Sequence, residues 1–467
     1  MQNENQMQIG RKDLLWNYAA TSMRILSGIV VLPITLRMLP SEEMGIWSIF
    51  LSLMTITTLL DFGFSNSFSR NVTYVYSGIK ELKAKGYAIV ETTEVDYGLL
   101  KSLLSAMKRY YGIAALVFLL LFVVGSPFYL PSVLEQYSGD KQIIWSAWFI
   151  FGVGLAYELY TYYYSSILIG RGQVKRNMQI IVFSQSIRIV ITLAFLFAGW
   201  GIISLVLGLL ISNIVNRTLS YYVFYDKATK ANLRNATTSS RDWDTIKTLT
   251  PNSLKIGFIS LSYLMRNQFI ILIAPFYLSL SQVAEYGISR QIISLIATIG
   301  IAWFNTFYPK LSQYSVQEKQ NDRKRLYIKG NMALLLTFIV LGSLLILSGS
   351  HILTFIQSQT SLLSGSYLFL MLLFLFLEQN QVIAHNMILA KNEVAFFKAN
   401  IISGIVSIAL LFIMLQFTSL GVLSLILCTG LALNVYLGWK LPYTVAKEIQ
   451  LTLKDYKEVA LSYLKKQ

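Results

Sequence analysis

The stretch LPSEEMGIWSIFLSLMTITTLLDFGFSNSFSR, residues 39–70, contains an unbroken run of uncharged residues between Glu43 and Asp61. An α-helix rises 1.5 Å per residue, so this run of 17 residues spans about 26 Å. That length approaches the thickness of the hydrocarbon core of a bilayer, about 30 Å. The stretch therefore predicts a membrane-spanning helix, with its charged flanks near water.

The composition extends this prediction to the whole chain. Of the 467 residues, 55% are hydrophobic and 13% are charged, against about 25% charged in soluble domains. A soluble protein of this length has too little interior to hide so much apolar surface. We predict an all-α membrane protein of about twelve helices. The expected spans are 14–38, 44–66, 109–130, 143–168, 178–198, 201–224, 253–278, 283–308, 328–348, 366–389, 396–416 and 419–440.

The basic residues between these spans predict the topology. With the N-terminus inside, 31 of the 39 lysines and arginines fall in cytoplasmic segments. This asymmetry follows the positive-inside rule and places both termini in the cytoplasm of a multi-pass inner-membrane protein. It also explains the net charge of +16 without nucleic acid, which would need a basic soluble face. Nucleic acid is therefore not an expected partner.

The residues that carry enzyme or metal chemistry are scarce. Cys428 is the single cysteine, and His351 and His385 are the two histidines, so the sequence predicts neither a metal site nor a cofactor. No nucleophile–base pair, phosphate-binding glycine loop or ATP motif stands out. The predicted outer loops are also too short for the domain in which a membrane glycosyltransferase places its chemistry. A non-enzymatic protein is expected.

An internal repeat predicts two halves. Shifting the chain by 242 residues aligns the first two spans with the seventh and eighth, without gaps and with 11 identities in 40 positions. An even number of spans in each half gives both halves the same orientation, as in transporters built from parallel repeats. The most informative matched pairs are Arg24 with Arg266, Pro33 with Pro275, Glu43 with Glu285 and Gly45 with Gly287.

The repeat divides the chain into two six-helix lobes, residues 1–224 and 251–441. The polar segment 225–250 is the expected cytoplasmic linker, and 442–467 is a cytoplasmic tail. Leu441, Val445, Ile449 and Leu453 follow an i, i+4 spacing near the start of this tail. The pattern predicts an amphipathic helix on the inner membrane surface, with an ordinary charged terminal helix as the alternative.

Three segments resemble a known family. The quoted stretch 39–70, its counterpart YLSLSQVAEYGISRQIISLIATIGIAWFNTFYPKLSQ (277–313) and the loop LIGRGQVKRNMQI (168–180) are similar to bacterial polysaccharide transporters, the Wzx-type O-antigen flippases. The likeness covers nearly the whole chain and includes the wider superfamily of MATE exporters and the lipid II flippase. It implies two lobes around a central cavity, lined by the first two helices of each half.

The resemblance also implies function and partners. The expected activity is translocation of a polyprenyl-diphosphate-linked oligosaccharide across the bacterial inner membrane, with lipopolysaccharide O-antigen as one candidate substrate. Membrane lipids are expected partners, and polysaccharide assembly proteins are further candidates. A MATE-like exporter of organic cations is the alternative function, and a membrane glycosyltransferase is a weaker one.

Arginines inside the predicted spans indicate a substrate site. An arginine at mid-depth costs at least about 2.5–3.5 kcal/mol on insertion scales, so it is expected to face protein or water. Guanidinium groups bind phosphate oxygens in a bidentate manner, and a site of this kind suits a diphosphate linker. The predicted substrate-binding residues lie on polar stripes of the first, seventh and eighth spans: Asn17, Arg24, Lys255, Ser262, Arg266 and Arg290.

Four embedded carboxylates leave other roles open. Each arginine has the alternative of pairing with Asp61, Glu158, Glu285 or Glu378. Asp61 is a candidate for ion coupling, for gating or for helix capping. Glu158 lies among tyrosines that either stack on sugars or belong to an interfacial belt. Glu378 is a further coupling or gating candidate. Arg217, near an inner helix end, is a candidate for snorkelling toward water.

Overall fold

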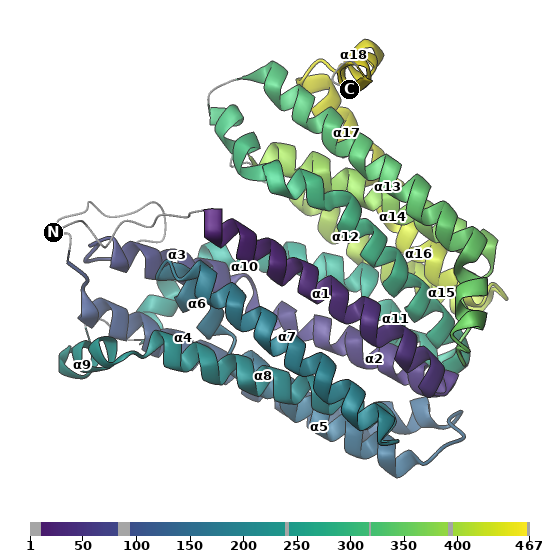
Figure 1. The fold of residues 1–467 in the computed structure, drawn as a ribbon, viewed down its shortest axis with the longest axis horizontal. Helices are drawn as coiled ribbons and strands as arrows, with labels where there is room; N and C mark the ends of the chain where they lie inside the picture. The colour runs from purple at the N-terminus through teal and green to yellow at the C-terminus, as the bar shows by residue number, and fades with distance from the viewer. Residues whose placement is uncertain (1–10, 83–93, 239–241, 317–318, 391–395, 465–467) are drawn as a thin grey trace. The chain divides into compact units, whose positions relative to one another are not determined.

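The computed structural model describes residues 11–82, 94–238, 242–316, 319–390 and 396–464, and these form helices without a strand (Figure 1). Within this part of the chain, nine helical segments are long and apolar enough to cross a membrane. They correspond to the third to sixth and the eighth to twelfth predicted spans. The prediction of an all-α, multi-pass membrane protein is confirmed, and the twelve-helix layout is compatible with the model.

The chain divides into two compact units. Unit 1 comprises Met1–Glu43 and Phe50–Ser260, and unit 2 comprises Met44–Ile49 and Leu261–Gln467. The chain enters unit 2 for six residues within α2 (Ser41–Thr57) and passes into it finally within α10 (Asp242–Asn267). The segment 225–250 contains α9 (Lys227–Asn235) and the start of α10, both of which belong to unit 1.

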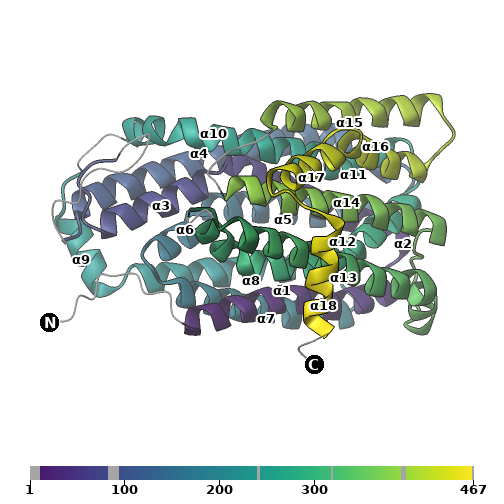
Figure 2. The same cartoon turned by 90° about the horizontal axis from the view of Figure 1, so that it is seen from above.

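In unit 1, α1 packs along α7, and α7 packs along α8 (Figures 1 and 2). Helix α5 also packs on α8, and α3 packs on α6. The helices that precede α9 are α1 (Arg11–Met38), α2 (Ser41–Thr57), α3 (Phe64–Tyr76), α4 (Tyr97–Leu134), α5 (Lys141–Tyr160), α6 (Tyr163–Gly170), α7 (Val174–Phe197) and α8 (Ile202–Phe224). Residues Met44–Ile49 of α2 belong to unit 2.

The second span is broken, although the sequence analysis predicts a continuous helix over 44–66. A short 3₁₀ turn, η1 (Thr58–Asp61), follows α2, and Phe62 and Gly63 have φ values of 44° and 73°. These left-handed conformations interrupt the helix. Asp61 then accepts a hydrogen bond from the Ser65 amide at 3.0 Å and stabilises the first turn of α3.

In unit 2, α12 packs along α13, and α13 along α14 (Figure 1). The seventh span is also broken: α10 ends at Asn267, the short helix α11 follows, and the 3₁₀ turn η2 then contains Pro275, which has no N–H to donate. The elements of this unit after α10 are α11 (Phe269–Ile273), η2 (Ala274–Phe276), α12 (Leu280–Val316), α13 (Gln320–Phe355), α14 (Gly365–Leu389), α15 (Phe397–Phe417), α16 (Val422–Asn434), α17 (Leu437–Glu448) and α18 (Leu453–Leu464).

Two glycines matched by the repeat allow close packing in unit 2. A Cβ atom at position 45 would lie 2.2 Å from the carbonyl oxygen of Leu280, and one at position 287 would lie 2.3 Å from Oγ of Ser48. The start of α2 therefore crosses α12 at a distance that side chains at these two positions would prevent. This contact gives a physical reason for glycine at both repeat positions. The predicted superposition of the two halves stays a prediction.

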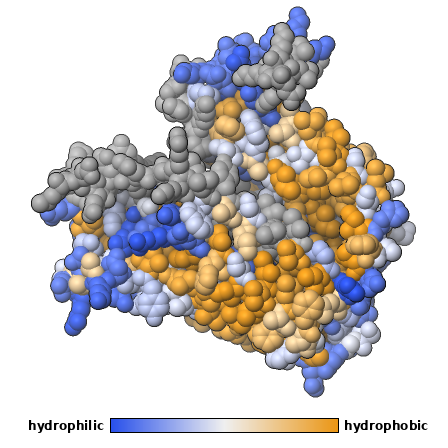
Figure 3. Space-filling model, in the orientation of Figure 1, coloured by the Kyte–Doolittle hydropathy of each residue, from blue (hydrophilic) through white to orange (hydrophobic). Residues whose placement is uncertain are grey.

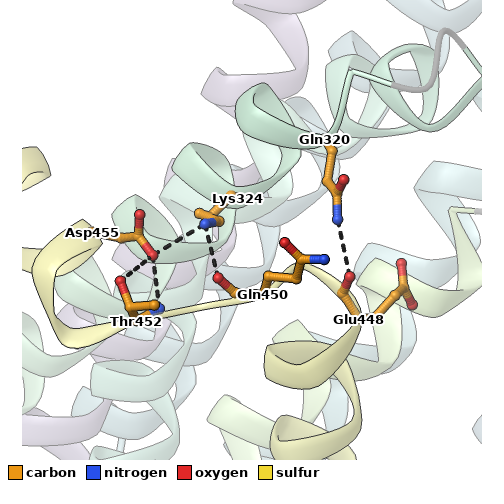
Figure 4. A network of polar contacts seen from close by, with 6 residues as sticks. All are labelled: Gln320, Lys324, Glu448, Gln450, Thr452 and Asp455. Carbon is orange, nitrogen blue, oxygen red and sulfur yellow. Dashed lines mark hydrogen bonds and ion pairs between the residues drawn. The ribbon is translucent and has the colours of Figure 1, made fainter.

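The start of the tail packs on protein, unlike the membrane-surface helix expected from the sequence. Leu441, Val445 and Ile449 are at most 1% exposed, and α17 packs against α14. Beyond it, Lys324 of α13 donates to Asp455 at 3.1 Å and to the Gln450 carbonyl at 2.9 Å (Figure 4). These contacts fasten α18 to α13. The Leu453 side chain lies outside the described residues.

The surface of each unit fits a lipid environment. Large apolar side chains are exposed along α7 and α8 of unit 1 and along α13 of unit 2, where Figure 3 shows broad hydrophobic areas. Phe197 and Leu347 are examples, with 68% and 72% of their surfaces exposed. In water such patches would be a liability, whereas hydrocarbon chains cover them at no cost in hydration.

Candidate functional site

Unit 2 encloses a buried polar cluster around Arg266 of α10. The Arg266 side chain is 5% exposed, and its Nη1 donates to Oγ of Ser403 at 2.6 Å and to the carbonyl oxygen of Asn400 at 3.4 Å. Both acceptors belong to α15. A buried charge is tolerated when hydrogen bonds replace its hydration, and α15 provides two of them here.

The second arginine of this cluster reaches a carboxylate through an amide. Arg290 of α12 donates from Nη2 to Oδ1 of Asn267, and Nδ2 of Asn267 donates to Oε1 of Glu378 at 3.3 Å. Glu378, on α14, is 6% exposed. Within the described part of the chain, neither Arg266 nor Arg290 forms a direct ion pair with a carboxylate. Asn267 therefore separates the positive and negative groups.

A donor remains available in this cluster. Nε of Arg266 is buried and has no hydrogen-bond partner among the described residues. Arg290 and Glu378 line a narrow cavity together with Tyr286 and Asn434. An anionic oxygen bound beside Arg266 would satisfy its unpaired Nε–H, which otherwise remains costly to bury.

The other predicted substrate-binding residues are placed as follows. Ser262 is 1% exposed, one turn before Arg266. A Cβ atom at Gly404 would lie 3.0 Å from the Cα atom of Ser262. Helix α15 therefore approaches α10 closely enough to bring Ser403 to Arg266. The side chains of three residues lie outside the described part of the structure: Asn17 and Arg24 on α1, and Lys255 on α10.

Unit 1 contains a larger polar cavity, with an empty volume of about 1110 Å³. It lies among α3, α5, α6, α7 and α8, and includes Glu158, one of the predicted coupling residues. Hydroxyl and amide groups dominate its walls. The polar lining residues are Ser65, Ser69, Glu158, Tyr162, Ser165, Ser166, Asn177, Ser184, Gln185, Ser212, Asn213, Asn216 and Arg217.

Arg217, which the sequence marks as a candidate for snorkelling, lies in the wall of this cavity. Its side chain is 8% exposed, its Nη1 donates to Oγ of Ser165 at 3.2 Å, and its guanidinium lies 5.9 Å from the ring centroid of Tyr162. Its Nε is buried and has no hydrogen-bond partner in the described part of the chain. The cavity wall holds the guanidinium, because Ser165 of α6 accepts its hydrogen bond and the ring of Tyr162 lies near it.

Glycines position the cavity walls. A Cβ atom at Gly208 would lie 2.0 Å from Oγ1 of Thr192, so α8 packs tightly on α7. That contact allows Asn216 of α8 to donate to Oγ of Ser184 on α7 at 3.0 Å. Gly170 provides a comparable approach of α6 to α3, where a Cβ atom would lie 2.6 Å from a backbone oxygen.

Glu158 and Asp61 are both engaged by neighbouring side chains. Glu158 accepts a hydrogen bond from Nδ2 of Asn213 at 2.8 Å within the unit 1 cavity. Asp61 is 7% exposed and accepts from the hydroxyls of Ser65 and Tyr111. Its geometry is that of a cap for α3. Glu285, the remaining embedded carboxylate, accepts from Ser361 at 2.9 Å.

Several residues of these sites were missed from the sequence. The run SNIVNR, residues 212–217, places Asn213, Asn216 and Arg217 at i, i+3 and i+4 and therefore on one helix face. This spacing was the available signal for the unit 1 cavity. Asn267 and Ser403 have no such pattern, because their importance depends on contacts between helices distant in sequence.

Comparison with known proteins supports the fold. No family model and no curated protein matches the sequence. Among solved structures, the chain is similar to the lipid II flippase MurJ, in an inward closed conformation, with 16% identity, a TM-score of 0.63, and coverage of 97% of this chain and 91% of that one.

Two further structures agree with this result. An inward-facing multidrug resistance MATE family transporter of the MOP superfamily has 15% identity and a TM-score of 0.62, with 96% and 98% coverage. A MOP superfamily transporter from Pyrococcus furiosus, described as having a binding pocket of reverse polarity, has 14% identity and a TM-score of 0.53, with 94% and 96% coverage. The chain has the fold of these transporters and flippases, which are not enzymes.

Proposed function

We propose that this protein is a flippase for a polyprenyl-diphosphate-linked oligosaccharide, an O-antigen or another surface polysaccharide unit. Alternating access would move the substrate from the cytoplasmic to the outer leaflet. The observation that carries the proposal is the pair of buried arginines in unit 2, Arg266 and Arg290, which lack a direct carboxylate partner in the described chain. Guanidinium groups with spare donors suit phosphate oxygens.

The second candidate is a MATE-like exporter of organic cations, favoured by the structural likeness to a MATE transporter. Binding a cation requires accessible negative charge. Besides the basic residues near span ends that are counted with the loops, the predicted spans contain six basic residues and four acidic ones. Asp61 and Glu378 already accept hydrogen bonds from neighbouring side chains. The balance of embedded charge therefore supports an anionic substrate.

The setting of this activity is part of the proposal. The positive-inside pattern supports an inner-membrane location with both termini in the cytoplasm. Membrane lipids and the lipid-linked saccharide are the proposed partners, and polysaccharide assembly proteins are further candidates. Reporter fusions placed within 225–250 and at Gln467 should both report a cytoplasmic position, and an external position at either point would overturn this topology.

A binding comparison tests the function. The purified full chain is titrated with undecaprenyl diphosphate and, separately, with ethidium, while thermal unfolding is followed. We expect the diphosphate to raise Tm and ethidium to leave it unchanged, because a ligand stabilises the state that binds it. Arg325→Ala, at an exposed position on α13, serves as the matched control and should respond like the wild type. Stabilisation by ethidium alone would favour the exporter.

A further inference from the structure

The unit 1 cavity has a chemistry that a diphosphate site does not require. Its walls combine four amide side chains with several serine hydroxyls, whereas a phosphate group calls for concentrated positive charge. Asn, Gln and Ser each donate and accept hydrogen bonds. A sugar ring presents hydroxyls with the same dual character. The amides are Asn177, Gln185, Asn213 and Asn216.

Arg217 adds one positive group to these walls. Its side chain is more than nine-tenths buried, and its Nε has no hydrogen-bond partner among the residues that the structure describes. Arg217 forms no ion pair with a carboxylate in the described chain. Glu158, which also lines the cavity, is bound to Asn213. A buried guanidinium with an unused donor favours an anionic ligand group, since pairing offsets the cost of burial.

The size of the cavity is also suitable. The space that it offers to water-sized groups is about 410 Å³, which lies within the range for small-molecule sites, about 300–1,000 Å³. The hydroxyl of Ser165 and the ring of Tyr162 lie beside the guanidinium. One end of the ligand would therefore meet a charged and aromatic wall, and the remainder would meet amides and hydroxyls.

We propose that this cavity is a saccharide subsite that binds an acidic sugar, with the sugar carboxylate on Arg217 and the ring hydroxyls on the amide-lined wall. The proposal rests on the proposed function and names the glycan chemistry of its substrate. It assigns the sugar to unit 1 and leaves the diphosphate to the arginines of unit 2. A neutral sugar would use the amides but leave the guanidinium donors unpaired.

The test uses the purified full chain and two soluble probes, a glucuronate-containing disaccharide and the corresponding neutral glucose disaccharide. Binding is measured by calorimetric titration. The acidic probe should bind more tightly than the neutral one. Arg217→Gln should weaken binding of the acidic probe about tenfold or more, because a charge-assisted hydrogen bond is lost. It should change the affinity for the neutral probe little. Arg234→Gln, at an exposed position on α9, is the matched control and should behave as wild type.

A second variant guards against a folding defect. Gln185→Leu removes a lining amide and keeps the approximate side-chain volume, and it should weaken both probes by a similar factor. Thermal unfolding of each variant checks the fold. Equal binding of the acidic probe by wild type, Arg217→Gln and Gln185→Leu would overturn the subsite, as would no binding by the wild type.

Undecaprenyl diphosphate without sugar separates this inference from the function itself. Its binding should survive Arg217→Gln, because the diphosphate is assigned to unit 2. Binding of this lipid by a wild-type chain that binds neither disaccharide would refute the saccharide subsite and leave the flippase proposal standing. Binding of ethidium in place of the lipid would refute the flippase proposal.

Discussion

The two units bury the same kinds of residue in different settings. In unit 2, Asn267 joins Arg290 to Glu378 beside a narrow cavity with an empty volume of about 310 Å³. In unit 1, Asn213 holds Glu158 in the wall of a cavity of about 1110 Å³ that Arg217 also lines. The same amide–carboxylate contact therefore has two settings. In unit 2 it lies beside a narrow cavity, and in unit 1 it lies in the wall of a larger polar cavity.

This difference shows what determines the cost of a buried charge. A charged group beside a narrow cavity depends mainly on its protein partners, because little space is left for water. A group in the wall of a polar cavity can exchange a protein partner for water or ligand. The sequence alone gives similar weight to Glu158 and Glu378, whereas the structure separates them by their surroundings.

The largest expected effect is a contrast between Asn267→Leu and Asn213→Leu. In unit 2 the substitution leaves Arg290 and Glu378 without their shared amide, and we expect a loss of about 3 kcal/mol, because each buried charged group loses a hydrogen bond. In unit 1 Glu158 can hydrogen-bond to water, so about 1 kcal/mol or less is expected. Unfolding in detergent measures both values. Equal losses of stability in the two variants would show that Glu158 depends on its amide partner as strongly as Glu378 does.

The next effect concerns ligand binding by unit 2. Arg266→Ala and Arg290→Ala should each weaken undecaprenyl diphosphate by about ten- to hundredfold, equivalent to about 1.5–3 kcal/mol. Arg24→Ala is predicted from its repeat position to do the same. Lysine should rescue each site only in part, because it keeps the charge without the planar fork. Normal binding and normal saccharide export by all three stably folded alanine variants would make these arginines structural.

A smaller effect tests the packing that forms the unit 1 cavity. Gly208→Ala forces α8 away from Thr192 of α7 and should destabilise the protein by about 1–3 kcal/mol, as overpacking does. Gly125→Ala is the control, because a Cβ atom there meets nothing within 4 Å. It should be neutral or stabilising by up to about 1 kcal/mol. Equal loss in both variants would point to a general intolerance of alanine.

The smallest effect compares contacts outside the membrane. Burial acts to raise the pKa of Asp226, but hydrogen bonds from Thr229 and the ion pair with Arg171 at 2.9 Å outweigh it, so the pKa is lowered. Hydrogen bonds from Thr452, followed by that from Lys324, lower the pKa of Asp455. Both contributions should be present above pH about 4 and be lost as acid protonates the carboxylates.

Unfolding measured between neutral pH and pH 3 checks this dependence. Asp226→Asn and Asp455→Asn should each show a slightly smaller loss of stability in acid than the wild type, because one linked carboxylate is absent. An unchanged acid profile in both variants would show that these surface pairs contribute nothing measurable, as many exposed pairs do.

Much of the fold was predictable from the sequence. Apolar length and loop charge predict the spans well, because the bilayer imposes both. The breaks after Asp61 and Asn267 were missed, because hydropathy averages over local backbone conformation. The glycines at 45 and 287 were found through the repeat, although their close contacts were visible only in the structure.

The site was less predictable, for a physical reason. An arginine in an apolar run indicates an unusual environment, and Arg266 and Arg290 were found for this reason. Its partners are amides and hydroxyls on other helices, such as Asn267 and Ser403, and these residue types are too common to stand out. Arg217 was recognised as embedded, but its cavity depends on packing among five helices.

Reconstitution into proteoliposomes tests the central claim most directly. The full chain is presented with a fluorescently labelled undecaprenyl-diphosphate saccharide on one leaflet, and appearance on the other leaflet is measured beside ethidium transport in the same vesicles. We expect saccharide translocation that falls in Arg266→Ala and persists in Arg325→Ala, with no ethidium transport. Ethidium transport without saccharide translocation would contradict the account.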